Sequence, residues 1–113
     1  MRSSHGRLRD IVEAIDRIER FVPITADELI NNEERQVWFV HHLQIIGEAA
    51  RVLPESIRAQ MPAVPWRQWV GLRHILVHEY FGVDVPAVHN AVNNDLAVLL
   101  KAVEGWLAAN PEP

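Results

Sequence analysis

The sequence predicts an all-α fold, a bundle of four or five helices with short connections. Apolar residues recur at helical spacing along most of the chain, no segment alternates like a β-strand, and prolines cluster at the joints. With 113 residues, 49% of them hydrophobic, the chain is long enough for one domain with its own core. We therefore expect a single up-and-down helical domain over residues 1–109 and a disordered tail over residues 110–113.

The first helix is expected to lie before Pro23. Leu8, Ile11, Ile15 and Ile18 follow the three-four spacing of one helical face, and charged residues fill the remaining positions. Proline cannot continue a helix, so Pro23 marks its end.

The second long helix is expected over Glu33–Leu53. Before it, Thr25 and Glu28 form the pattern of a capping box, and the pair 31–32, both asparagine, breaks or re-caps the chain. The helix carries a wide apolar surface, which indicates contact with more than one neighbour. Because this surface exceeds what one small bundle is expected to cover, we predict a two-fold dimer.

A third helix is expected after the prolines of residues 54–65. Pro65 suits a first helical position, and Gly82 suits the residue that follows a helix end, so the helix should run from Pro65 to Tyr80 or Phe81. A short turn fills residues 54–61. The last helix then opens at Asp84 and Pro86 and continues to about residue 108.

Composition limits the classes of function. The net charge of −4 argues against a protein that coats nucleic acid, since such domains carry a broad basic face. The absence of cysteine excludes disulfides and thiolate metal sites. No apolar run reaches the roughly 20 residues of a membrane span, and the first residues lack the apolar core of a signal peptide. We expect a cytoplasmic protein without a membrane segment.

The stretch GLRHILVHEY, residues 71–80, concentrates polar side chains inside the third predicted helix. Arg73 offers a permanent charge and a fork that matches phosphate oxygens, and His78 can move protons near neutral pH. Tyr80 adds a ring and a hydroxyl. An arginine and a histidine suffice for metal-free RNA cleavage, in which the RNA's own 2′-hydroxyl attacks phosphorus.

Helix geometry separates Arg73 from His78 by about 140°. Three arrangements would still bring them to one substrate. The long arginine wraps round the helix, or the helix frays near Glu79, or two copies of the helix meet across a two-fold axis and each supplies what the other lacks.

Two simpler interpretations of the same residues remain open. Arg73 and His78 can be a surface ion-pairing group and a structural histidine. Alternatively, His74 and His78 are one helical turn apart, which is a metal-ligand spacing. In a bundle, other side chains could complete such a metal site: His41, His42, Glu48 and His89.

The segment resembles the signature of HEPN-domain proteins, an arginine followed after four to six residues by a histidine. Arg73 to His78, continued by Glu79 and Tyr80, gives the Arg-x4-His-x-Tyr form of the HepT toxins. The upstream stretches 46–49 (Ile-Gly-Glu-Ala) and 64–66 (Val-Pro-Trp) resemble the same family at suitable spacing. His74 departs from the pattern, because many relatives carry asparagine or aspartate there.

The resemblance implies a small dimeric helical toxin that cleaves RNA without metal or cofactor, in a cleft between protomers. Arg73 would hold phosphate and His78 would move protons, with Glu48 and His74 as candidates for orienting them. It also implies an antitoxin partner, an MntA-like minimal nucleotidyltransferase, which transfers AMP from ATP to Tyr80.

Other functions fit the same sequence. The chain can be a non-catalytic HEPN subunit that positions substrate for its nucleotidyltransferase, and then RNA cleavage is lost while partner binding is kept. It can be a metal-binding bundle, which metal analysis after chelation would reveal. In a third alternative, the motif is only a structural dimer contact.

Overall fold

The computed structural model describes residues 2–75, 77–78 and 82–112. Its elements are α1 (Ser4–Glu19), α2 (Ala26–Ile30), α3 (Glu33–Val52), α4 (Glu55–Arg58), α5 (Trp66–Ile75), β1 (Val77–His78), β2 (Gly82–Val83), α6 (Val85–Asn90), η1 (Ala91–Asp95, a π-helical segment) and α7 (Leu96–Ala109). The all-α class is therefore confirmed. Within the described ranges, no helix combines the length and hydrophobicity that a membrane span requires.

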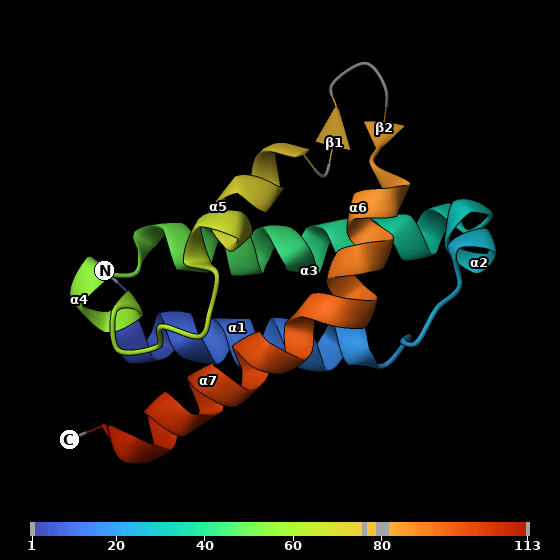
Figure 1. Cartoon of the computed structure of the whole chain (residues 1–113). Coiled ribbons are helices and arrows are strands. Elements are labelled where there is room, and N and C mark those ends of the chain that lie inside the picture. Colours follow the sequence, from blue (N-terminus) through green and yellow to red (C-terminus); the bar gives the residue numbers. More distant parts are fainter. Residues whose placement is uncertain (1, 76, 79–81, 113) are drawn as a thin grey trace.

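The bundle is built around the antiparallel pair α1 and α3, which lie side by side (Figure 1). On one side, α7 packs against α1. On the other side, α5 and α6 both contact α3, and the β1–β2 pair lies beyond their ends. The element that carries Arg73 is thus supported by α3, whereas α7 supports the opposite side of the bundle.

Apolar side chains from α1, α2, α3, α6 and α7 form most of the buried core. Each removes surface from water and contributes roughly 1.5–3 kcal/mol when fully buried. The largest fully buried ones are Leu8, Ile11, Ile15, Ile18, Leu29, Phe39, Leu43, Ile46, Val88, Leu99 and Val103. Because α1, α2, α5 and α6 all contact α3 within one chain, the wide apolar surface of that helix does not itself require a second copy.

The structure confirms the capping residues predicted for the segment 25–32, which precedes α3. The Thr25 hydroxyl accepts from the Glu28 backbone N–H at 3.1 Å, and the Glu28 carboxylate accepts from the Thr25 N–H at 3.3 Å, which completes the capping box. Asn32 caps α3 by accepting from the Arg35 N–H at 2.9 Å. These local contacts separate α2 from α3 at the predicted place.

The third helix ends earlier than expected. We predicted a helix from Pro65 to residue 80 or 81 and no strands, but α5 ends at Ile75 and β1 pairs with β2 in an antiparallel register. Val77 faces Val83 in that register, and branched side chains favour strand over helix. Gly82, which we expected to stop the helix, instead adopts φ +75° inside β2, a conformation that glycine accepts without strain.

The last helix begins and ends where the sequence predicts, within one residue. Asp84 caps α6 by accepting from the Ala87 N–H at 3.1 Å, and α7 ends at Ala109. The π-helical turn η1 between them was not predicted. The domain bounds of 1–109 and the disorder of residues 110–113 stay predictions.

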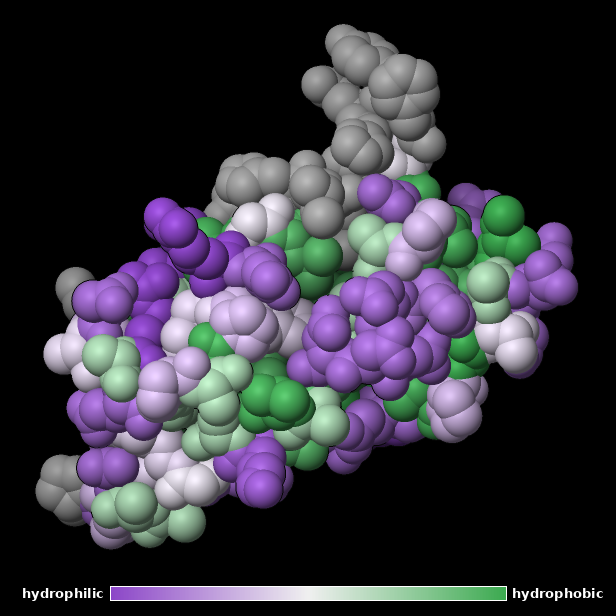
Figure 2. Space-filling model, in the orientation of Figure 1, coloured by the Kyte–Doolittle hydropathy of each residue, from purple (hydrophilic) through white to green (hydrophobic). Residues whose placement is uncertain are grey.

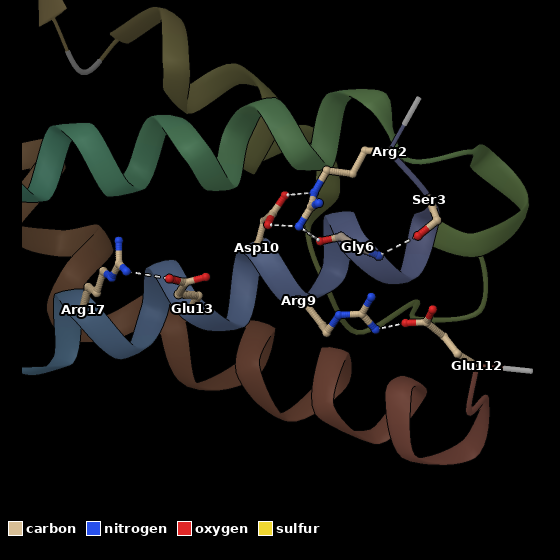
Figure 3. Close-up of polar contacts among 8 residues, drawn as sticks. All are labelled: Arg2, Ser3, Gly6, Arg9, Asp10, Glu13, Arg17 and Glu112. Atoms are coloured by element: carbon tan, nitrogen blue, oxygen red, sulfur yellow. Dashed lines mark hydrogen bonds and ion pairs between the residues drawn. The ribbon is translucent and has the colours of Figure 1, made fainter.

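Polar contacts tie both ends of the chain to α1 (Figure 3). The Arg2 guanidinium donates two hydrogen bonds to the Asp10 carboxylate, at 2.6 and 2.7 Å. The Ser3 hydroxyl caps α1 by accepting from the Gly6 N–H, and Arg9 forms an ion pair with Glu112. Exposed ion pairs such as these contribute little to stability, because solvent screens the charges.

Candidate active site

The predicted catalytic residues lie on two different elements. Arg73 and His74 belong to the last turn of α5, and His78 belongs to β1. Their side chains lie outside the part of the chain that the structure describes, as does the whole of Tyr80. Their roles therefore stay predictions.

The early end of α5 changes the predicted relation between Arg73 and His78. Their 140° separation on one helix does not apply, because the helix stops at Ile75 and β1 includes His78. The arginine that wraps round, the helix that frays near Glu79 and the two copies that meet across a two-fold axis all stay predictions, because the described backbone ends α5 four residues before Glu79. In β1, His78 pairs in register with Gly82, which fixes its backbone relative to the start of α6.

Glu48, the other predicted supporting residue, lies on α3 beside α1. Its carboxylate accepts two hydrogen bonds from the Arg51 guanidinium, at 2.6 and 3.1 Å. It also lines a surface groove of about 340 Å³ with Arg7 and Asp10 of α1 and His41 of α3. No described lining residue of that groove comes from α5, so Glu48 and the α5 motif are not brought together there.

A second cavity is lined in part by residues of α5. This α5–α6 cavity, of about 450 Å³, is lined by Gln68, Trp69 and Leu72 from α5 and by Ala87, Asn90 and Asp95 from α6 and η1. Its lining is mostly apolar, with polar groups from Gln68, Asn90 and Asp95. Figure 2 shows hydrophilic side chains gathered over α6 and η1. Sequence reasoning missed Asn90 and Asp95, and the only signal was the polar run His-Asn-Ala-Val-Asn-Asn-Asp at residues 89–95.

The buried histidine of α3 has a structural partner. His42 is only 2% exposed, and its Nδ1 donates to the Trp38 carbonyl at 2.7 Å. Burial lowers the pKa of His42, and the charges of His41, Arg17 and Arg20 lower it further, while the Trp38 hydrogen bond opposes them. Among the described side chains, no three His, Asp or Glu residues are grouped as metal ligands.

Comparison with known proteins identifies the family. A family model described as "HepT-like: Ribonuclease HepT-like" matches residues 11–105, which include α5 and β1. A Methanocaldococcus jannaschii protein named "Putative RNase MJ1380" is 42% identical over 98 residues, covering 86% of this chain and 90% of that protein. A Thermococcus cleftensis protein named "Probable ribonuclease HepT" is 36% identical over 99 residues, covering 87% and 90%. No solved structure gives a significant match. The chain therefore belongs to the HepT-like ribonuclease family.

Proposed function

We propose that this protein is an endoribonuclease that cleaves RNA without a metal ion and uses Arg73 and His78. One observation carries the proposal, namely the Arg-x4-His-x-Tyr run at residues 73–80 inside the segment that matches a ribonuclease family. The names of the relatives support the same class of reaction.

The reaction is an internal transesterification. The 2′-oxygen attacks the adjacent phosphorus, the bond from phosphorus to the 5′-oxygen breaks, and a 2′,3′-cyclic phosphate and a 5′-hydroxyl form. His78 takes the 2′-hydroxyl proton or gives one to the 5′-oxygen, since imidazole exchanges protons near neutral pH. Arg73 offsets the charge that builds on the phosphorane. His74 and Glu48 are candidates for orienting these two groups.

The proposed biological setting is a toxin–antitoxin pair. A homodimer would form the RNA cleft, and an MntA-like minimal nucleotidyltransferase would neutralise the enzyme. That partner would transfer AMP from ATP to Tyr80, with release of pyrophosphate. This part of the proposal is supported by family membership and by the tyrosine two residues after His78.

Cleavage of RNA by the purified protein in excess chelator tests the central claim. His78→Ala should lower the rate roughly a hundredfold or more, because a proton-transfer group is lost. Arg73→Ala should lower it by a comparable factor, because charge stabilisation is lost. Products should carry a cyclic phosphate or a 3′-phosphate.

Two matched variants control this experiment. Arg67→Ala removes an exposed arginine of α5 outside the motif, and His89→Ala removes a partly exposed histidine of α6. Both should cleave at the normal rate. Cleavage that needs added divalent metal, or normal cleavage by both motif variants, would refute the assignment. If the wild-type protein cleaves no RNA but still binds its nucleotidyltransferase partner, the chain is a non-catalytic subunit.

A further inference from the structure

The α5–α6 cavity has the size and composition of a small-molecule subsite. Its volume of about 450 Å³ lies within the range of roughly 300–1,000 Å³ typical of ligand pockets. Such pockets are mainly apolar with a few convergent polar groups. Here Trp69 and Leu72 supply apolar wall, and Gln68, Asn90 and Asp95 supply the polar groups.

The π-helical turn η1 brings the polar groups of one wall together. In a regular α-helix, residues five apart point about 140° away from each other. Hydrogen bonding from residue i to i+5 instead stacks such residues, and π turns occur frequently at functional sites. Asn90 and Asp95 are five apart, and the Asn90 amide donates to the Asp95 carboxylate at 3.3 Å. The side-chain Nδ2 of Asn94 in turn donates to the side-chain Oδ1 of Asn90 at 2.8 Å, which holds the Asn90 amide in place.

The carboxyl of Asp95 is an acceptor that favours amino groups. Asp95 is exposed as a residue, and partial desolvation raises the pKa of its carboxyl. A carboxylate accepts from N–H groups and repels carbonyl oxygens. Adenine, cytosine and guanine present an exocyclic amino group. Uracil presents one ring N–H flanked by two carbonyl oxygens.

The cavity adjoins the proposed catalytic segment along the chain. Its α5 wall includes Leu72, and Arg73 is the next residue. Its other wall is formed by α6 and η1, which come after β2 in the sequence. In β2, Gly82 pairs in register with His78. Both walls are therefore direct continuations of the segment that carries Arg73 and His78 (Figure 1). This continuity along the chain links the cavity to the segment that we propose binds RNA.

We propose that the α5–α6 cavity is a subsite for one unpaired RNA base that carries an exocyclic amino group, selected by Asp95 with Asn90. This inference rests on the proposed function, because it makes the cavity a specificity determinant of the same reaction. Apolar wall from Trp69 and Leu72 covers the base, and the Asp95 carboxylate accepts from its amino group. Uracil at that position is disfavoured.

Binding of nucleotides tests the cavity independently of cleavage. The four nucleoside 3′-monophosphates are titrated at millimolar concentration while amide NMR signals of η1 are followed. The 3′-monophosphates of adenosine, cytidine and guanosine should bind about tenfold more tightly than that of uridine. This is the discrimination expected of one well-formed polar contact to a base. Asp95→Asn should reduce that difference to less than about twofold, since an amide donates to uracil oxygens as well as accepting.

Glu104→Gln is the matched control, because it removes one exposed carboxylate from α7 outside the cavity. It should leave the preference unchanged. Thermal melting of Asp95→Asn should equal that of the wild type, since the change is nearly isosteric at an exposed position. No binding of any nucleotide, equal binding of all four, or an unchanged preference in Asp95→Asn would each overturn the subsite.

Cleavage of short RNAs that differ at one nucleotide then links the cavity to the reaction. Wild-type kcat/KM should fall about tenfold when uracil replaces an amino-bearing base at one position next to the cleaved bond, and Asp95→Asn should remove this dependence. If no RNA is cleaved but the binding preference is found, the proposed function fails and the subsite stands. If RNA is cleaved without any base preference at either neighbouring position, the subsite fails and the proposed function stands.

Discussion

The side-chain amide of Asn93 forms a reciprocal pair of hydrogen bonds with the backbone of Ile24. Its Oδ1 accepts from the Ile24 N–H at 3.0 Å, and its Nδ2 donates to the Ile24 carbonyl at 3.0 Å. The same Nδ2 also donates to the His89 carbonyl at 2.9 Å. Asn93 thus ties the π-helical turn η1 to the connection before α2, two segments far apart in the sequence.

Asn93→Ala should destabilise the fold by about 1–3 kcal/mol, because the partly buried backbone groups of Ile24 lose their partner. Urea denaturation measures this as a lower midpoint with an unchanged slope. Asn94→Ala is the control on the next residue, which is exposed. It should change stability by less than about 0.5 kcal/mol. Equal midpoints for the two variants would contradict the assigned role of Asn93.

Stability should fall as the pH drops below the ordinary histidine pKa of 6.5, and His42 should be a cause. In the folded chain burial lowers the pKa of His42, so below pH 6.5 the unfolded chain binds a proton that the folded chain does not. Proton uptake then favours unfolding, and the loss continues until the pH reaches the lowered pKa. Urea midpoints measured from neutral to acid pH follow this slope.

His42→Asn should make that part of the slope shallower. Asparagine does not titrate, and its amide can still donate to the Trp38 carbonyl that accepts from His42 in the structure. His41→Asn is the comparison, because His41 is an exposed neighbour on the same helix. It should leave the slope nearly as in the wild type. If His41→Asn flattens the curve and His42→Asn does not, the buried ring is not responsible.

The sequence predicted a helix well where its capping residues and its apolar spacing indicated the same bounds. For α3, the acidic first turn after Asn32 and the apolar spacing gave bounds within one residue of Glu33–Val52. The predicted end of α5 was wrong, because Val77 continues the helical spacing of apolar residues, and a strand of two residues is too short to show an alternating pattern. Pairing with Val83 decides between helix and strand, and that contact belongs to the folded chain.

The candidate site could be predicted only in part for a similar reason. The motif residues stand out as polar groups in an apolar run, so their positions were predictable from residue type. Asn90 and Asp95 are ordinary surface residues in the sequence, and they become neighbours only through the π turn. Residue types alone give no signal for such a turn, since π-helical segments are rare.

A site shared between two protomers predicts complementation. If Arg73 of one protomer acts with His78 of its partner, Arg73→Ala and His78→Ala should each be inactive alone but active when mixed. A mixed dimer then holds one intact site of two, and half of the dimers are mixed, so activity should recover to about a quarter of the wild type. Light scattering at micromolar concentration should show a dimer. A monomer there would remove the prediction, and a dimer without recovery would place each site within one protomer.

Modification of Tyr80 should inhibit the enzyme without unfolding it. Tyr80 stands in the sequence midway between His78 and Gly82, the register partners of β1 and β2. Transfer of AMP joins its hydroxyl oxygen to the α-phosphorus of ATP and releases pyrophosphate. The new phosphodiester is an anion seven residues from Arg73 in sequence, and it would compete with RNA phosphate for the arginine charge. The bulky adenosine would also obstruct the cleft.

Tyr80→Phe separates a modification site from a packing residue. The ring is kept, so folding and RNA cleavage should match the wild type, while neutralisation by a partner nucleotidyltransferase with ATP should fail. Mass spectrometry after co-expression with that partner should find AMP on the wild-type peptide that contains Tyr80 and none on the phenylalanine variant. Because the partner can also bind without modifying, neutralisation is measured with and without ATP. An unmodified wild-type peptide, together with full neutralisation of the phenylalanine variant, would assign inhibition to binding alone and rule out the switch at Tyr80.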